Sequence, residues 1–277
     1  MPDRKRSILI TGCSTGIGLA AARTLKARGW RVLATARKPK DLERLRATEG
    51  LEAIACELSD PASIARCAEE ALARTGGQLD ALYNNAAYGL IGAMEDVTPA
   101  QLRSCLEVNV IAVHDMTRRV IPAMRAQGHG RIVMCSSVLG LVAGPYRGPY
   151  CASKYALEAM SDALRLELRP AGIHVSLIEP GPIESEFLAT TLAVFQASVD
   201  PETSPHRDYY RRRLSQMQSG ASARFKLGPE AVVEKLIHAL ESPRPRARYK
   251  IGLPTRAAAL LKRALPDVLM DPVLRRM

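Results

Sequence analysis

The chain of 277 residues is long enough to enclose one large core, and 47% of its residues are hydrophobic while only 4% are aromatic. The formal charge of +11 raises the question of nucleic acid as a partner, but the basic residues lie in separate short clusters without a binding motif, so no nucleic-acid partner is expected. No apolar run approaches the length that spans a bilayer.

Short apolar runs alternate with longer helical stretches, which is the pattern of βαβ units. The first run, Ser7–Thr11, is continuously apolar or β-branched, as in strands buried on both faces. We therefore predict an α/β fold in a single domain (residues 1–277): a Rossmann-type, doubly wound, seven-stranded parallel sheet with helices on both faces. The expected strands are Ser7–Thr11, Arg31–Thr35, Glu52–Cys56, Ala81–Asn84, Arg131–Cys135, His174–Ile178 and Arg248–Ile251, and the expected helices are Gly16–Arg28, Pro61–Arg74, Pro99–Ala126, Tyr150–Leu168 and Pro229–Glu241.

Two segments depart from this alternation. Residues 184–227 are richer in polar and charged residues, with aromatic side chains at irregular spacing, and are interpreted as a mobile substrate lid inserted in the domain. Residues 254–277 form a basic, amphipathic, leucine-containing tail. This tail is expected to pack on its own domain or on a sister subunit, and peripheral contact with a membrane surface stays open as an alternative.

Cysteine and histidine usage indicates neither a disulfide framework nor a metal site. The six cysteines form no CxxC pair, and most lie in apolar stretches, which favours reduced, buried thiols in a cytoplasmic protein. No secretion signal is expected, because the chain reaches an apolar strand within eight residues, without an h-region or a cleavage site. His114, His129 and His174 fall on different predicted elements without ligand spacing.

A glycine-rich loop follows the first strand and opens the first helix. Within Thr11–Gly18, Gly12 permits a tight turn, Gly16 allows backbone to approach a pyrophosphate, and Gly18 lets the helix pack closely on the sheet. The helix N-terminus adds N–H donors and a positive dipole end. The loop, including Ser14, Thr15 and Ile17, is therefore predicted to bind a dinucleotide.

The end of the second strand indicates which dinucleotide. An acidic residue there accepts hydrogen bonds from the ribose hydroxyls of NAD, but the chain instead has Arg37 followed by Lys38. An arginine can hold a 2′-phosphate through charge-assisted bonds, whereas a carboxylate would repel it. NADP(H) is the predicted cofactor.

Tyr150 and Lys154 lie four residues apart at the start of a predicted helix and share one face. A tyrosine with an ordinary pKa near 10 is a poor base at neutral pH. A nearby ammonium and an oxidised nicotinamide would lower the pKa of the Tyr150 phenol toward the working range.

These motifs occur in a particular order along the chain. The glycine-rich loop, Asn84-Asn85-Ala86, Asn109, Ser137, Tyr150-x-x-x-Lys154 and the run 179–183 after the sixth strand resemble a classical short-chain dehydrogenase/reductase. Runs 131–138, 153–165 and 175–183 resemble its 17β-hydroxysteroid and retinol dehydrogenase-like branch, in particular bacterial NADP-dependent aldehyde reductases.

The resemblance implies a role for each matching residue. Tyr150 is implied as general acid/base and Lys154 as the residue that binds the nicotinamide ribose. Ser137 is implied to bind the substrate carbonyl oxygen, and Asn109 to hold a water of the proton relay. The remaining implied cofactor contacts are Glu57 and Leu58 along the adenine, Asn85 and Ala86 in the cofactor cleft, and Pro180, Gly181 and Ile183 around the nicotinamide.

The chain departs from the family pattern at two positions: Ala87 replaces a usual glycine, and Glu57 a usual aspartate.

The expected function is NADP(H)-dependent reduction of a lipophilic aldehyde or ketone, in a homodimer or homotetramer. The alternatives are a dinucleotide-binding sensor without catalysis and an NAD-dependent steroid- or retinol-type alcohol dehydrogenase. A sensor would be expected to lack the tyrosine or the lysine.

Overall fold

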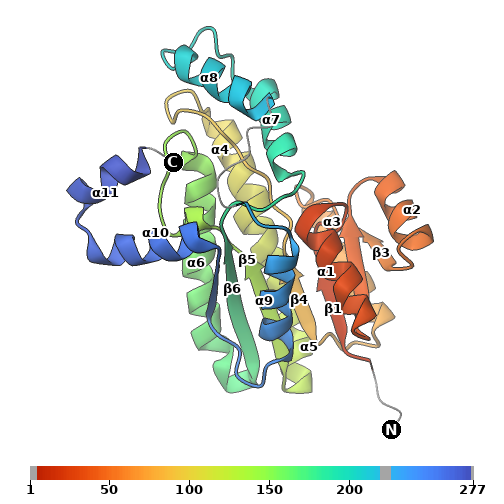
Figure 1. Cartoon of the computed structure of the whole chain (residues 1–277). Coiled ribbons are helices and arrows are strands. Elements are labelled where there is room, and N and C mark those ends of the chain that lie inside the picture. Colours follow the sequence, from red (N-terminus) through yellow and green to blue (C-terminus); the bar gives the residue numbers. More distant parts are fainter. Residues whose placement is uncertain (1–4, 219–225, 276–277) are drawn as a thin grey trace.

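The computed structural model describes residues 5–218 and 226–275. Seven parallel strands form one sheet in the order β3-β2-β1-β4-β5-β6-β7, which confirms the predicted doubly wound topology (Figure 1). The order reverses between β1 and β4, where ligands bind in such sheets. The strands are β1 Ser7–Ile10, β2 Arg31–Ala36, β3 Glu52–Ala55, β4 Ala81–Asn84, β5 Gly130–Cys135, β6 Ile173–Pro180 and β7 Arg248–Ile251.

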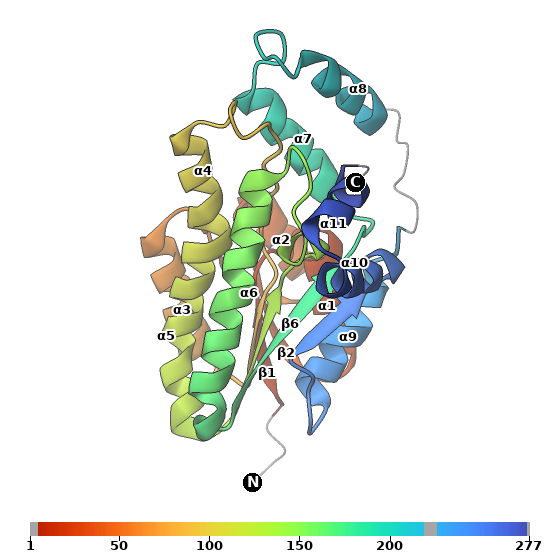
Figure 2. The ribbon, with the colours of Figure 1, turned by 90° about the vertical axis from the view of Figure 1, so that its left-hand side faces the viewer.

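Helices cover both faces of the sheet. One face packs against α1, α2 and α9, and the opposite face packs against α3, α5 and α6 (Figure 2). Their bounds are α1 Gly16–Ala27, α2 Pro39–Ala47, α3 Pro61–Arg74, α4 Pro99–Leu106, α5 Ala112–Gln127, α6 Gly148–Leu168 and α9 Glu230–Glu241. The prolines at the starts of α3 and α4 follow Asp60 and Thr98, whose side chains cap these helices by accepting backbone N–H bonds.

One helix prediction was wrong, and one helix was not predicted. The sequence pattern suggests one helix over Pro99–Ala126, but a π-helical turn, Glu107–Ile111, separates α4 from α5. Helix α2 was missed because most of its side chains are charged and only Leu42 and Leu45 are buried.

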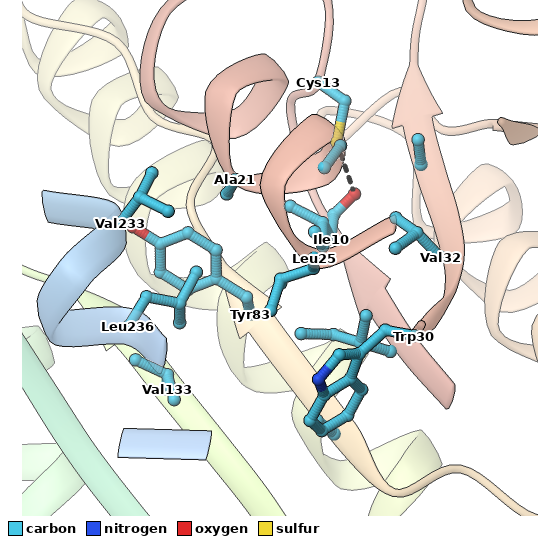
Figure 3. Packing of buried hydrophobic residues seen from close by; sticks show 14 of the residues in the cluster. Ile10, Cys13, Ala21, Leu25, Trp30, Val32, Tyr83, Val133, Val233 and Leu236 are labelled. Carbon is cyan, nitrogen blue, oxygen red and sulfur yellow. Dashed lines mark hydrogen bonds between the residues drawn. The ribbon is translucent and has the colours of Figure 1, made fainter. Parts of the chain in front are cut away.

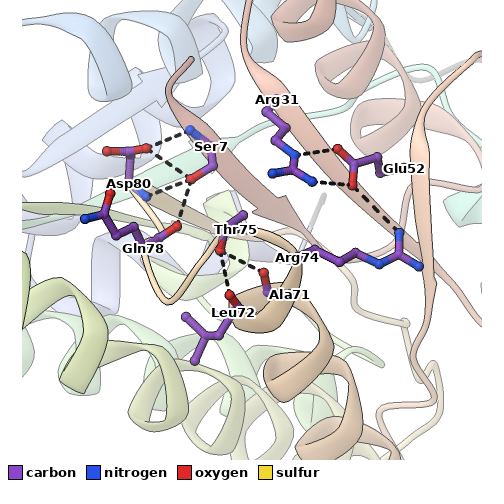
Figure 4. Close-up of polar contacts among 9 residues, drawn as sticks. All are labelled: Ser7, Arg31, Glu52, Ala71, Leu72, Arg74, Thr75, Gln78 and Asp80. Atoms are coloured by element: carbon purple, nitrogen blue, oxygen red, sulfur yellow. Dashed lines mark hydrogen bonds and ion pairs between the residues drawn. The ribbon is translucent and has the colours of Figure 1, made fainter. Parts of the chain in front are cut away.

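Aliphatic side chains from the strands and helices pack together on each face of the sheet, and Figure 3 shows one of the two faces, around Tyr83 and Leu25. Polar contacts tie the amino-terminal edge of the sheet together (Figure 4). There the Asp80 carboxylate accepts from the backbone N–H of Ser7 at 2.7 Å, and Arg31 pairs with Glu52 at 2.6 Å across β2 and β3. The candidate site lies at the opposite edge, where the carboxyl ends of the strands meet.

Residues 184–227 contain α7 Phe187–Ser198 and α8 Arg207–Gln218, which lie beyond the carboxyl ends of the strands (Figure 1). The part of the predicted lid at 219–225 lies outside the described residues. The two ends of the segment meet, because Glu184 N–H donates to Leu227 O at 2.8 Å and Leu227 N–H donates to Pro182 O at 3.1 Å.

The C-terminal tail forms α10 Leu253–Ala264 and α11 Asp267–Leu274, and it packs on its own domain. Buried Ala258 and Met270 contact a cluster formed by Val138, Leu139, Val142 and Cys151. The end of the tail, residues 276–277, lies outside the described residues.

All six cysteines are free and buried, in agreement with the sequence prediction. No helix in the described part of the chain is long and apolar enough to cross a membrane.

Candidate active site

The glycine-rich loop has the geometry that its sequence predicts. Gly12 and Gly16 adopt φ angles of +73° and +56°, which side-chain-bearing residues rarely take. A Cβ on Gly18 would lie 2.1 Å from the carbonyl oxygen of Gly12, so only glycine lets α1 start this close to the turn. The loop thus forms a cradle of backbone N–H groups at a helix N-terminus, which fits a pyrophosphate.

Asn85 and Ala86 fix this cradle from the end of β4. The Asn85 side-chain amide donates to the carbonyl oxygens of Thr11 and Gly12 at 2.9 and 3.1 Å. The backbone N–H groups of Asn85 and Ala86 both donate to the Thr11 hydroxyl, at 2.9 and 3.0 Å. The structure therefore brings the first and fourth strand ends together, and Thr11 is a structural residue of the site that the sequence analysis did not single out.

Arg37 and Glu57 face each other at the ends of β2 and β3. Their nearest charged atoms are 3.9 Å apart, and 61% and 42% of their side-chain surfaces are exposed. Solvent at this position weakens the ion pair, so the guanidinium can turn to an incoming anion. Leu58 is buried beside them.

A cleft of about 580 Å³ opens beside the glycine-rich loop, lined by Ser14, Thr15, Gly16, Leu19, Asp41, Arg44, Glu184, Ser185, Glu186 and Lys226. Arg44 comes from the unpredicted helix α2, and its guanidinium donates to the carbonyl oxygen of Ser14. Sequence reasoning missed Arg44 because its contact depends on the position of α2. Lys226, near the end of the segment 184–227, contributes a second cation.

Pro180, Gly181 and Ile183 continue from β6 past the cleft. Gly181 N–H donates to Ile251 O at 3.1 Å, and a Cβ on Gly181 would lie 3.0 Å from the Thr255 hydroxyl. Ile183 forms an isolated bridge with Leu227. This run is therefore held between β7, α10 and the end of the lid segment.

Tyr150 and Ser137 meet at the carboxyl end of β5. Burial raises the pKa of the Tyr150 phenol well above its usual range, and the interaction with the Ser137 hydroxyl lowers it in part. Ser137 Oγ accepts from Leu139 N–H at 3.1 Å, so its own proton is available to another acceptor. The phenol is a proton donor in this state, and the lowering expected from a bound nicotinamide stays a prediction.

Lys154 lies one helical turn after Tyr150, with Nζ 5.5 Å from the centre of the tyrosine ring. Its side chain is almost completely buried, and Nζ donates to Cys135 O at 2.8 Å. Burial lowers the pKa of the Lys154 ammonium, because a charge is removed from water.

Asn109 is buried in the π-helical turn that separates α4 from α5. Its amide donates to Tyr88 O at 2.9 Å and to Ser153 Oγ at 3.1 Å, and Ser153 Oγ in turn donates to Tyr150 O at 2.7 Å. The turn joins Asn109 to the start of α6, and π turns are frequent at functional sites. Ser153, missed by the sequence analysis, stands directly before the lysine of the YxxxK pair.

An aromatic side chain lies beside Tyr150, and several apolar side chains of neighbouring segments are exposed. The ring of Phe187, at the start of α7, lies 5.5 Å from the Tyr150 ring. Phe187, Leu188 and Met94 are exposed, at 37%, 46% and 57%. Leu139 and Val142 pack nearby with the C-terminal tail. No group of His, Cys, Asp and Glu side chains among the described residues is arranged to hold a metal ion.

Comparison with known proteins bears on this geometry. The profile of the family described as short chain dehydrogenase matches residues 6–193. The oxidoreductase YbbO of Escherichia coli K12 is 46% identical over 272 residues, covering 98% of this chain and 94% of its own. Human 17-beta-hydroxysteroid dehydrogenase type 1 is 35% identical over 257 residues, covering 87% of this chain and 76% of its own.

Solved structures of similar proteins contain either nicotinamide dinucleotide. A short chain dehydrogenase/reductase from Burkholderia phymatum in complex with NAD has a TM-score of 0.79 at 25% identity, with 98% of this chain and 95% of that chain covered. A metagenomic short-chain oxidoreductase in complex with NADP has a TM-score of 0.68 at 26% identity, with 88% and 95% covered.

Proposed function

The chain belongs to the short-chain dehydrogenase family, and from this premise we propose that it reduces a lipophilic aldehyde or ketone to the alcohol with NADPH. As a member of this family, the protein is an oxidoreductase that acts on an alcohol/carbonyl pair with a nicotinamide dinucleotide. The observation that carries the proposal is the meeting of Ser137, Tyr150 and Lys154 beside a cradle that three glycines keep open.

Each proposed catalytic side chain has a distinct task. A bound NADPH supplies the hydride. The Ser137 hydroxyl binds the carbonyl oxygen and Tyr150 donates a proton to it, and this donation fits a buried phenol whose pKa is raised. The Lys154 ammonium holds the ribose and stabilises the phenolate left after proton transfer. Such acid/base assistance contributes about 10²–10⁴ in rate.

The preference for NADP(H) rests on the end of β2. The exposed Arg37 guanidinium pairs only at 3.9 Å with Glu57, so a 2′-phosphate can become its closer partner. The preference for a lipophilic substrate rests on Phe187, whose ring lies beside Tyr150, and on the exposed side chains of Leu188, next in the chain, and Met94, which lies against Gly148. The presence of all four catalytic residues supports an enzyme rather than a sensor.

The proposal is tested by following NADPH oxidation with medium-chain aldehydes, retinal and steroid ketones, with NADH as the control. Turnover with NADPH and little with NADH would support it. Turnover with NADH alone would favour the NAD-dependent dehydrogenase. Tight NADPH binding without turnover on any carbonyl would favour the sensor.

We also propose that the C-terminal tail contacts an anionic bilayer. Its outer face exposes Leu253, Leu260, Val268, Leu269 and Val273 by 42–75%, beside the exposed cations Arg256 and Arg263. On α10 the apolar side chains are flanked by cations, whereas α11 also exposes Asp267 and Asp271; the α10 arrangement fits the surface of anionic lipids. A symmetric contact between two such tails would instead bring like charges together.

Flotation with vesicles tests this contact. The full chain should float with vesicles that contain phosphatidylglycerol, and a Leu260→Glu, Val268→Glu variant should not. Equal flotation of the variant, or a concentration-dependent dimer that the same changes abolish, would overturn the membrane proposal. The homodimer or homotetramer stays a prediction from family resemblance.

A further inference from the structure

Helix α6 carries a row of four polar side chains at four-residue spacing: Tyr150, Lys154, Glu158 and Asp162. Residues at this spacing lie above one another on one face of a helix. The proposed reaction uses the first two. The row continues with two carboxylates, the first of them buried, directly behind the catalytic lysine.

The buried ammonium of Lys154 needs a counter-charge. It is 3% exposed, and the neutral carbonyl of Cys135 is its hydrogen-bond acceptor. An isolated cation is costly in such surroundings. Among the described residues no carboxylate forms an ion pair with Nζ, and Glu158 is the next ionisable side chain along the row. Burial lowers the pKa of Lys154, and Cys135, Cys105 and Glu158, in that order, raise it; Glu158 is the carboxylate among the three.

Arg248 from β7 holds Glu158 in place. Its Nε donates to Glu158 Oε2 at 3.2 Å, while its two terminal nitrogens bind the Asp162 carboxylate at 3.0 and 2.6 Å. The second Glu158 oxygen, Oε1, is buried and has no hydrogen-bond partner in the described part of the chain. Arg248 therefore orients Glu158 through one carboxylate oxygen and leaves the other oxygen of Glu158 without a hydrogen bond.

The same carboxylate reaches the loop that carries Ser137. The Ser136 hydroxyl lies beside Glu158 and lowers the pKa of that carboxyl, which burial raises. The turn Val138–Gly140 lies directly on the row. A Cβ on Gly140 would be 2.7 Å from Ser136 Oγ, 3.1 Å from Glu158 Cγ and 3.2 Å from Lys154 O. Glu158 is thus packed close both to the helical turn that carries Lys154 and to the loop that carries Ser136 and Ser137.

A further buried carboxylate, Glu179, also contacts Arg248. Glu179 is completely buried and lies 3.1 Å from Arg248 Nε, so three carboxylates share one guanidinium. Arg165 pairs with Asp162, and the charge of Lys250, on β7, lowers the pKa of the Glu179 carboxyl. Burial first, and Glu158 second, raise the pKa of Glu179 to about 7. Arg248 thus divides its contacts among three carboxylates, and among the described residues the Glu158 Oε1 oxygen is left without a hydrogen-bond partner.

We propose that Glu158 is a positioning residue for the reaction: held by Arg248, it supplies the counter-charge that keeps the buried Lys154 side chain protonated and in place beside Tyr150. The electrostatic part of this inference concerns the folded protein alone. Its kinetic consequence rests on the proposed function, in which the Lys154 ammonium stabilises the Tyr150 phenolate.

A double-mutant cycle on the ligand-free protein tests the electrostatic part. Glu158→Gln, Lys154→Met and the double variant are unfolded with urea at pH 7. The loss of the Arg248 contact, and the effect on Glu179, are common to both arms of the cycle and cancel. The matched control cycle uses Asp162→Asn with Lys154→Met, which removes a carboxylate on the same face, one turn further from the lysine.

Glu158→Gln should raise the unfolding equilibrium constant at least tenfold more in the presence of Lys154 than in its absence, and the Asp162→Asn cycle should show a coupling below about twofold. Equal couplings in the two cycles, or none in the Glu158 cycle, would overturn the proposal. This outcome does not depend on turnover, so it is independent of the proposed function.

The kinetic readout is the pH profile of kcat/KM for the carbonyl. Loss of the counter-charge makes Lys154 lose its proton at lower pH, so the alkaline limb of the Glu158→Gln profile should move to lower pH by about one unit. Glu158→Asp, which keeps the charge, should restore most of the shift, and Asp162→Asn should leave the limb in place. A Glu158→Gln profile that only falls in height, without a shift, would show a merely structural role.

Discussion

The docking of α8 on the domain depends on one phenol, which makes Tyr210→Phe an informative change. Tyr210 is 1% exposed, accepts from Ala93 N–H at 2.7 Å and donates to Asp96 Oδ2 at 2.6 Å. Phenylalanine keeps the ring and its contact with Phe195, but it removes both bonds. Only the polar part of the docking is then tested.

The expected cost follows from the two bonds. A buried N–H left without a partner costs about 1–3 kcal/mol, and a bond to a carboxylate contributes about 1.5–3 kcal/mol. Ser204 still donates to Asp96, at 2.6 Å, which limits the second loss. We therefore expect docking of α8 to weaken by about 2–4 kcal/mol, equivalent to about a 30- to 1,000-fold larger undocked population.

Limited trypsin digestion measures this population, because α8 carries the exposed arginines Arg207, Arg211 and Arg212. Cleavage within α8 should accelerate in proportion to undocking when closing is faster than cleavage. Tyr209→Phe is the matched control: its ring stacks on Tyr146 with centroids 3.5 Å apart, and its hydroxyl makes no hydrogen bond within the described part of the chain. A Tyr210→Phe cleavage rate within twofold of the wild-type rate would refute the reasoning.

Four further changes test the site. Tyr150→Phe should lower kcat about 10²–10⁴-fold with NADPH affinity nearly unchanged, measured by turnover and by nucleotide fluorescence; wild-type turnover would remove Tyr150 from catalysis. Arg37→Asp should weaken NADPH binding at least several-fold and favour NADH, and an unchanged ratio of the two affinities would exclude Arg37 from phosphate binding. Gly18→Ala should abolish dinucleotide binding, as seen by calorimetry, because its Cβ would lie 2.1 Å from Gly12 O; retained affinity would contradict the close approach. Glu179, with a folded pKa of about 7 against an ordinary 4.5, contributes stability below pH 4.5 that is lost as pH rises through 7. Glu179→Gln should therefore reduce the drop in unfolding free energy between pH 5 and pH 8 by up to about 3 kcal/mol, and an undiminished drop in urea titrations would contradict the assignment.

Much of the fold could be predicted because its determinants are local. Most strands are short, largely apolar runs, although Arg248–Ile251 alternates polar and apolar residues. Helices α1 and α3 begin and end where glycine, proline and capping residues direct them. The glycine-rich loop could also be assigned to a dinucleotide, because Gly12, Gly16 and Gly18 act through backbone conformation and close approach within eight residues of chain.

The sequence failed where periodicity carries no information about neighbours. The pattern runs unbroken through Pro99–Ala126, yet a π-helical turn places Asn109 against Tyr88 and Ser153. Helix α2 is short and mostly charged, with only Leu42 and Leu45 buried, so the sequence pattern did not identify it as a helix. The contact of its Arg44 with the glycine-rich loop was therefore not predicted either.

By itself, then, the sequence determined the order of the elements, the dinucleotide cradle and the identity of Ser137, Tyr150 and Lys154 as candidates. Only the tertiary structure decided which charges surround them. Arg248 reaches Glu158 across 90 residues of chain, and Tyr210 reaches Asp96 across 114. Burial and Coulomb interactions depend on distance in space, and that distance is fixed by how the strands and helices pack rather than by their order.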